Sequence, residues 1–419
     1  GKLRPPKYGL LRFLVDAIDS GAASDILLVP TCTTYDQLNE IGKMVAEEAG
    51  AAKAKEGLVW LADYARKQGT HLGKAYVRFG EPFSLREGLA AAGEETRNRR
   101  WTLDKVAFEV FQRINRVTPV TAPALMTLAL LGVHDHALTL EEVHEVVRPL
   151  LDYAVQRHLP TAMLSPLDDV REVETVLNIL VQAGVVRRYD DGLSPIFHIE
   201  PGKHSEAAYY RNSAIHWFVN RAIVELGVMV GLRHARGDSL ERGWEAVFAL
   251  RDLLKFEFFF SEKEDFREEI KAEAALLDPL FAQYIAERKA SADLLTKAPF
   301  LVAHRVLPAF LEAYFIVADR LAAQPTEVAL EQTQFLAECV AVGRQYVLQK
   351  RLRNPECISR ELFGNALALA ANRGLLAPGS ADLAQRRRRF ADETAAAVAA
   401  VAAIGELDYR KRIGAQETH

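Results

Sequence analysis

The chain has 419 residues, of which 49% are hydrophobic and 26% charged, and its net charge is −4. This length and composition are typical of a globular protein with two or three domains. No stretch approaches the roughly 20 apolar residues that a membrane-spanning helix needs. The three cysteines, Cys32, Cys339 and Cys357, lie far apart, which argues against a disulfide framework or a structural zinc site.

Residues 1–100 show the alternating pattern of an α/β domain. Residues 10–18 have the apolar spacing of a helix, and Ile26 to Val29 form a short apolar run that predicts a strand buried on both faces. Pro30 has no amide hydrogen, so we expect the strand to end there. Residues 31–35 should then form a loop at the carboxyl end of the sheet, where open α/β folds bind ligands.

The remainder of this region continues the pattern. We expect a helix over residues 35–52 and a second strand over residues 73–82 that ends in Gly80-Glu81-Pro82. A charged linker at residues 94–100 closes the region. The predicted boundary therefore separates residues 1–100 from residues 101–419.

Helical periodicity dominates after Trp101, as at Val106, Val110, Ile114 and Val117. The predicted fold class is thus α/β followed by mostly α. Residues 139–200 differ, because two helices at about 140–158 and 168–183 precede a hairpin signal, Asp191-Gly192, between apolar runs. Helix, helix and hairpin outline a winged-helix-like segment.

A winged helix raises nucleic-acid binding as an alternative function. Residues 139–200 contain five Arg and no Lys against eleven Asp and Glu, a net charge of −6. Neutralisation of phosphates by cations supplies most non-specific DNA affinity. We therefore expect a structural module and no nucleic-acid partner.

Scattered motifs resemble those of the glycerol-3-phosphate acyltransferases of the large bacterial PlsB type. The family has a V/I-P-x-x-x-x-Y-D/E segment, followed by F-G-E-P on a later strand. The matching residues are Val29, Pro30, Tyr35 and Asp36, Phe79 to Pro82, Arg113 to Asn115, Tyr209 to Asn212 with His216, and Leu254 to Glu257. Because they keep the family's order and rough spacing, the resemblance covers most of the chain.

The chain departs from the family at its catalytic motif. The family carries an H-x-x-x-x-D pair and then an E-G-G-R-S-R-T-G-K-L-like segment, but none of the eleven histidines here has Asp five positions later. Gly1-Lys2-Leu3 looks like the tail of that segment. We expect a fragment without a catalytic residue of its own. The alternative is a non-catalytic regulatory or interaction subunit.

The resemblance implies a reaction and its partners. In the family, a histidine acts as general base on the sn-1 hydroxyl of glycerol 3-phosphate, which attacks the thioester of acyl-CoA or acyl-carrier-protein. This implies the first step of phospholipid synthesis, with no cofactor and no metal. The residues expected to shape the substrate site are Lys2, Pro30, Thr31, Tyr35 and Glu81.

Four further groups have a structural and a functional interpretation. Tyr209 to Asn212 with His216 favour a polar network between helices over a pocket wall. Phe256 and residues 258–260 favour core packing over lipid contact. His234 to Asp238 matches the H-x-x-x-D pair of a different acyltransferase family, but a surface turn with Asp238 or Ser239 as a helix cap is favoured. His134-Asp135-His136 has a metal-like look but lacks a full ligand set.

Basic residues cluster near the carboxyl end, where residues 384–412 carry a net charge of +3. A solvated helix face competes here with an anionic membrane surface, since each Lys or Arg near anionic lipid adds about 1 kcal/mol. The membrane interpretation places the protein peripherally on the cytoplasmic face of the membrane. Its candidate residues are Arg386, Arg387, Arg388, Arg389, Arg410, Lys411 and Arg412.

Overall fold

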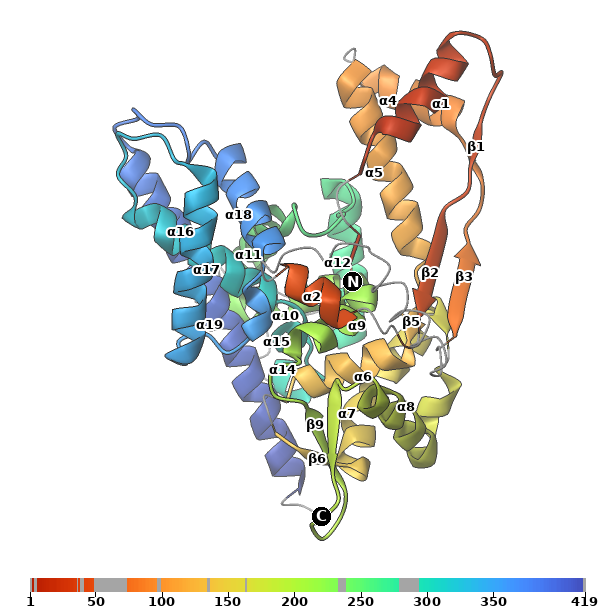
Figure 1. Ribbon diagram of the computed structural model, residues 1–419, viewed down its shortest axis with the longest axis vertical. Helices are drawn as coiled ribbons and strands as arrows, with labels where there is room; N and C mark the ends of the chain where they lie inside the picture. Colours follow the sequence, from red (N-terminus) through yellow and green to blue (C-terminus); the bar gives the residue numbers. More distant parts are fainter. Residues whose placement is uncertain are drawn as a thin grey trace, which may run out of the picture.

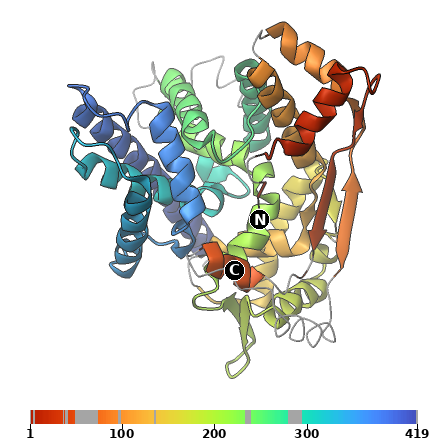
Figure 2. The ribbon, with the colours of Figure 1, turned by 45° about the horizontal axis from the view of Figure 1, so that its top comes forward.

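The computed structural model describes residues 2–3, 6–35, 37, 41–48, 74–95, 99–133, 136–162, 164–232, 239–278 and 294–416. This part of the chain is mostly helical with four small sheets, as the sequence predicted. Figures 1 and 2 show an arm of red and orange elements on one side and a group of blue helices on the other. The yellow and green elements lie between them.

The arm is built on a long antiparallel ribbon. Its elements are α1 (Gly9–Asp19), β1 (Leu27–Leu28), β2 (Thr31–Tyr35), β3 (Ala75–Phe79), β4 (Phe83–Ser84) and α4 (Leu85–Glu95). Strand β1 pairs with β4 and β2 with β3, both antiparallel. The Gly80 amide donates to the Pro30 carbonyl at 2.7 Å, so the two pairs form one ribbon with a break at Pro30. A Cβ on Gly80 would lie 2.8 Å from Val117 Cγ1, which is why glycine is required at this crossing.

The ribbon corrects two predictions. Leu27 is 65% and Val29 47% exposed, so the apolar run is not a strand buried on both faces. Residues 31–35 are a strand instead of a loop, and the described strands of the arm are antiparallel, so the argument from the carboxyl end of a parallel sheet does not apply. The ladder is interrupted only at Val29 and Pro30, and the β-branched threonines beyond them favour extended structure. Tyr35 is the last residue of this strand and not the start of a helix. Within the predicted helix 35–52, the described helical residues are those of α2 (Ile41–Glu48).

A small core holds the arm together. It consists of Val15, Ile18, Leu85, Ala92 and Val106. The last of these lies on α5 (Arg99–Val117), the helix that the periodicity predicted. This helix runs from the arm to the centre of the molecule (Figure 1).

The centre contains the predicted hairpin and its two helices. The elements are β5 (Val120–Thr121), α6 (Ala122–Leu131), β6 (Leu138–Thr139), α7 (Leu140–Gln156), β7 (Thr161–Ala162), η1 (Ser165–Asp168), α8 (Val170–Gln182), β8 (Val186–Tyr189) and β9 (Ile196–Ile199). Strands β6, β9 and β8 form an antiparallel sheet in that order, and β5 pairs with β7 in parallel. The two helices and the hairpin are confirmed, whereas the winged-helix interpretation and the domain boundary stay predictions.

The rest of the chain is helical. It comprises α9 (His204–Ala214), η2 (Ile215–Trp217), α10 (Val219–Leu232), α11 (Ser239–Leu254), α12 (Lys263–Leu277), α14 (Leu294–Lys297), α15 (Ala303–Val306), α16 (Pro308–Ala323), α17 (Gln332–Leu348), η3 (Pro355–Cys357), α18 (Arg360–Asn372) and α19 (Leu383–Gln416). Helix α16 is almost wholly buried and packs against α18 and α19. One large hydrophobic core extends from Ile41 to Ile404.

A buried ion pair on α10 links this helix to the start of α15. Arg221 Nε donates to Glu225 Oε1 at 3.1 Å, and both side chains are at most 1% exposed. The Glu225 carboxylate also accepts the amides of Val302 and Ala303 at 2.8–3.0 Å, so its buried oxygens are satisfied.

Among the described residues, no single helix is both long and apolar enough to cross a bilayer. One pair of helices, His204–Trp217 and Val219–Leu232, reaches that length and hydropathy only when its two members are taken together, and the pair is bent by 77°.

Candidate functional site

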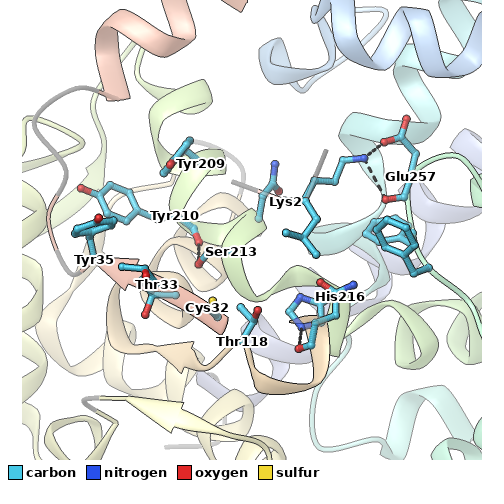
Figure 3. Close-up of a pocket in the computed structure, with 16 residues that line it drawn as sticks. Lys2, Cys32, Thr33, Tyr35, Thr118, Tyr209, Tyr210, Ser213, His216 and Glu257 are labelled. Carbon is cyan, nitrogen blue, oxygen red and sulfur yellow. Dashed lines mark hydrogen bonds and ion pairs between the residues drawn. The ribbon is translucent and has the colours of Figure 1, made fainter. Parts of the chain in front are cut away.

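A cavity of about 170 Å³ lies where the ribbon, α5 and α9 meet. Figure 3 shows side chains from these distant segments converging on it. Its lining residues are Lys2, Leu3, Cys32, Thr33, Thr34, Tyr35, Asn115, Thr118, Tyr209, Tyr210, Asn212, Ser213, His216, Glu257, Phe258 and Phe259. We call it the hydroxyl-lined cavity, because seven of these residues carry a hydroxyl group.

The two charged residues of the cavity bind each other. Lys2 Nζ forms an ion pair with the buried carboxylate of Glu257 and also donates to the Glu257 carbonyl at 3.1 Å. Asn365 Nδ2 donates to the same carboxylate at 3.1 Å. Burial raises the pKa of Glu257, while Lys2 acts in the opposite direction. The charges of this pair therefore cancel, and the lining carries hydrogen-bonding groups without net charge.

The end of α5 is held by η2, which lies about 100 positions further along the chain. A helix leaves its last carbonyl groups without partners inside the helix. His216 Nε2 lies 3.0 Å from the Asn115 carbonyl oxygen, and Trp217 Nε1 donates to the Thr118 carbonyl at 2.9 Å. The imidazole of His216 thus joins the wall of the cavity to the end of α5 (Figure 3).

One thiol faces this space. Cys32 on β2 is partly buried, and burial raises the pKa of its thiol, partly offset by a hydrogen bond with Thr118. The group is therefore a neutral thiol at physiological pH and adds a weak donor to the lining.

The structure brings together only some of the predicted site residues. Lys2 and Tyr35 line the hydroxyl-lined cavity. Pro30 is buried against Gly80, and Thr31 is exposed with its hydroxyl 3.3 Å from the Val29 carbonyl. Glu81 is exposed at the break of the ribbon. These three lie outside the cavity, because the segment expected to be a loop is paired in the ribbon.

Several lining residues that were not among the predicted substrate-site residues belong to the family-like motifs. Asn115, His216 and Glu257 belong to segments that the sequence singled out, and so do Tyr209 and Tyr210. The sequence favoured a purely structural polar network for the tyrosines and His216, but they form a wall of the cavity. A cluster of motifs far apart in the chain was the available signal. Cys32 and Thr33 belong to the segment 31–35 that the sequence expected beside a ligand, whereas Thr118 and Ser213 had no signal.

Arg211, in the middle of one motif, has a different role. Its guanidinium is 3% exposed and donates to Glu356 Oε1 at 3.2 Å. Burial lowers the pKa of Arg211, and Glu356 raises it. This ion pair joins α9 to η3 beneath a separate cavity of about 260 Å³.

The phenylalanine cluster is confirmed as core at two of its four positions. Phe258 and Phe260 are buried in the large core, and Phe258 lies edge-on to Phe310 with ring centroids 5.1 Å apart. Phe259 contacts the rings of Phe108 and Phe111. Phe256 is 39% exposed.

The two histidine motifs fall mostly outside the described residues. His234 to Asp238 and His134-Asp135 are among the residues left undescribed, whereas His136 stacks on Tyr409 with ring centroids 5.6 Å apart. Ser239 begins α11. In the part of the chain that is described, no group of three His, Cys, Asp or Glu side chains could hold a metal ion.

The basic residues of α19 do not form the predicted surface. Arg387 is 1% exposed and donates to three backbone carbonyls, and Arg386 Nη2 donates to the Arg373 carbonyl at 2.5 Å. Lys411 is half-buried and donates to the Ala298 carbonyl. Arg412 is also partly buried and lies 3.4 Å from the buried Asp408 carboxylate.

Three arginines of α19 remain exposed, namely Arg388, Arg389 and Arg410. At ~1.5 Å rise per residue, residues 386 and 410 lie about 36 Å apart along the helix. The exposed arginines therefore lie at two separate places on α19, and the helix turns the other four basic side chains wholly or partly toward the core.

Comparison with known proteins adds a family match. The model of the glycerol-3-phosphate acyltransferase C-terminal region matches residues 44–379. Proteins named "Putative acyltransferase plsB1" from Mycobacterium tuberculosis H37Rv and Mycobacterium bovis are each 41% identical over 417 residues, which is 98% of this chain and 66% of the relative. A "Glycerol-3-phosphate acyltransferase" from Aeromonas hydrophila is 26% identical over 90% of this chain and 47% of its own length. The chain thus spans less than two thirds of the length of these relatives.

Proposed function

The chain belongs to the glycerol-3-phosphate acyltransferase family, and from this premise we propose that the protein acts as a glycerol-3-phosphate 1-O-acyltransferase. The acyl group would come from acyl-CoA or acyl-carrier-protein. It would be transferred to the sn-1 hydroxyl of glycerol 3-phosphate, in the first step of phospholipid synthesis.

The observation that carries this proposal is the convergence of the family-like motifs on one cavity. Asn115, Tyr209, His216 and Glu257 come from three segments of the chain and line the same space. Packing alone does not require the conspicuous motifs of separate segments to share a polar cavity. A substrate site for a small polyol does require polar side chains from separate segments to line one cavity.

The chemistry divides between this chain and a general base. The sn-1 hydroxyl must lose its proton as its oxygen attacks the thioester carbonyl, and the thiol of the donor leaves as the ester bond forms. A positioned base contributes ~10²–10⁴-fold to such a step. The family's base belongs to an H-x-x-x-x-D motif, which this sequence does not contain. We therefore assign substrate positioning to this chain and expect no turnover by it alone.

The phosphate of the substrate needs cations that the hydroxyl-lined cavity does not offer. Lys2 would have to leave Glu257, and a buried carboxylate without its partner costs several kcal/mol. We therefore propose that Lys2 keeps the Glu257 carboxylate in place and that other basic groups bind the phosphate by charge-assisted hydrogen bonds. Tyr35 stays a candidate for direct substrate contact.

A membrane surface is the proposed place of action, because the product is a lysophospholipid. We propose peripheral attachment at the cytoplasmic face through anionic lipid. The exposed arginines of α19 are the remaining basic candidates from the sequence.

A non-catalytic partner protein is the second candidate function. The absence of an H-x-x-x-x-D pair from this sequence favours it. Such a protein would retain the cavity and lack acyl transfer even in the complete gene product.

Radiolabelled glycerol 3-phosphate separates these functions. The complete gene product and the 419-residue chain are each incubated with palmitoyl-CoA or palmitoyl-carrier-protein, and the lipid-soluble product is counted. We expect incorporation by the complete product, with the acyl group at sn-1, and none by the chain. No incorporation by the complete product with either donor would refute the enzyme proposal, and turnover by the chain would refute the assignment of the base.

A further inference from the structure

His216 lies in the wall between two cavities. It lines the hydroxyl-lined cavity and also a cavity of about 230 Å³ that contains Arg116, Trp217 and Phe260. It belongs to η2, the short turn at which α9 gives way to α10. Its side chain is therefore within reach of a small molecule in the hydroxyl-lined cavity.

The hydrogen bond to Asn115 determines the tautomer of the imidazole. A carbonyl oxygen only accepts, so the Nε2 atom 3.0 Å from it carries the proton. Burial lowers the pKa of His216 to about 4, and the ring is therefore neutral at pH 7. Its second nitrogen, Nδ1, then holds a lone pair and can only accept a hydrogen bond.

Nδ1 has no hydrogen bond within the described part of the chain. In Figure 3 the ring nitrogen away from the Asn115 carbonyl lies on the side of the ring that faces Lys2. The cavity therefore offers a fixed, neutral acceptor beside the hydroxyl groups of Thr118 and Ser213.

We propose that His216 binds a hydroxyl group of the glycerol moiety, which donates a hydrogen bond to Nδ1. This inference rests on the proposed function and names the part of the substrate that the cavity takes. A hydroxyl is the group that suits a neutral acceptor, whereas the phosphate monoester of the substrate, as a dianion, has no proton to donate to Nδ1. His216 is therefore a positioning residue, and it is not the general base.

Two substitutions separate this role from the support of α5. In His216→Gln the side-chain amide reaches the position of Nε2 and can still donate to the Asn115 carbonyl, but no acceptor remains at the position of Nδ1. In His216→Asn a polar atom stays near the position of Nδ1, but the bond to Asn115 is lost. Trp217→Phe serves as the matched control, because it removes the neighbouring bond to Thr118, while Trp217 is not itself among the residues that line the hydroxyl-lined cavity.

The test is a titration of the 419-residue chain, labelled with ¹⁵N-histidine, at pH 8 with glycerol 3-phosphate, glycerol or methyl phosphate, whose dianion has no O–H group. Long-range ¹H–¹⁵N spectra report the two ring nitrogens of His216 separately. We expect glycerol 3-phosphate and glycerol to shift Nδ1 more than Nε2, and methyl phosphate to shift neither. The titration continues to 50 times the concentration that saturates the complete gene product, or to about 0.1 M if that product is inactive. If Nδ1 responds to neither glycerol compound over this range, the inference is overturned.

Affinity gives the second readout. We expect His216→Gln to weaken glycerol 3-phosphate binding about 3- to 10-fold, as the loss of one hydrogen bond predicts, with little change in thermal midpoint. Trp217→Phe should lower the thermal midpoint without changing the affinity. Equal affinity of His216→Gln and the unaltered chain would overturn the inference. If His216→Gln fails to fold, the Nδ1 response of the unaltered chain decides by itself.

These outcomes are distinct from failure of the proposed function. If the complete product acylates glycerol 3-phosphate and Nδ1 does not respond in the chain, the inference fails and the function stands. If the complete product is inactive and Nδ1 responds to glycerol, the cavity is a polyol site and the proposed function fails.

Discussion

Replacement of Arg387 tests how far α19 contributes its arginines to the core. The side chain is 1% exposed. Its Nε donates to the Leu375 carbonyl at 2.9 Å, and Nη1 lies 3.2 Å from both the Gln324 and the Pro325 carbonyls. One guanidinium therefore holds the ends of α16 and α18 against α19.

The magnitude follows from these contacts. A hydrogen bond to a charged group contributes ~1.5–3 kcal/mol net, and the two bonds to Nη1 share one nitrogen. The guanidinium also regains hydration on unfolding, which offsets part of the gain. We expect Arg387→Gln to lower the free energy of unfolding by about 2–4 kcal/mol. With an unfolding entropy of ~2.1 cal/mol/K per residue, a chain of 419 residues should lose about 2–4 °C in thermal midpoint.

The neighbouring arginines supply the control. Arg388 and Arg389 are exposed, and surface substitutions usually change stability by less than about 0.5 kcal/mol. Thermal midpoints of Arg387→Gln, Arg388→Gln and Arg389→Gln are compared in one buffer. Sedimentation with anionic vesicles at rising salt should show the opposite order, with weaker binding only for the exposed positions. Equal midpoints for all three variants would refute the reasoning from burial.

Three further predictions concern buried charge and surface charge. Since the pKa of His216 is about 4 in the folded chain and about 6.5 unfolded, the unfolded state alone binds a proton between these values. His216 should therefore destabilise the fold by up to about 3 kcal/mol as pH falls from 6.5 to 4 and have no effect above this range. The free energy of unfolding, measured with urea across this range, should depend less on pH in His216→Gln than in the unaltered chain. The same pH dependence in both proteins would contradict the lowered pKa. Glu225→Ala should cost about 3–5 kcal/mol because it leaves Arg221 buried without its partner, whereas a loss below about 1 kcal/mol in denaturant unfolding would show that the pair is open to water. Residues 139–200 should not bind duplex DNA, given their net charge of −6, and a salt-sensitive mobility shift caused by this segment in the full chain would reverse that prediction.

The sequence by itself determined the family and most of the local structure. Apolar periodicity located α5, α7 and α8, and Asp191-Gly192 located the hairpin between β8 and β9. These signals are local, since helix and hairpin patterns are complete within one element. The motif residues that later met in the cavity were also visible, although their convergence was not.

The burial of Arg387 could have been predicted from the sequence. Leu383, Arg387, Phe390 and Thr394 are spaced along one helical face, and all are buried. The membrane interpretation counted all four arginines of the run as surface residues, although a helix directs successive side chains to different faces. The same periodicity that predicted α5 would have placed Arg387 toward the core.

Only the tertiary structure decided the ribbon and the site. Lys2 meets Glu257 across 255 positions of the chain, and no spacing rule relates residues so far apart. Residues 31–35 became a strand because β3 supplies ladder partners 40 to 48 positions away, from Ala75 opposite Tyr35 to Phe79 opposite Thr31. Such contacts depend on which surfaces pack together, and the free energy of packing is a property of the whole fold and not of any single segment.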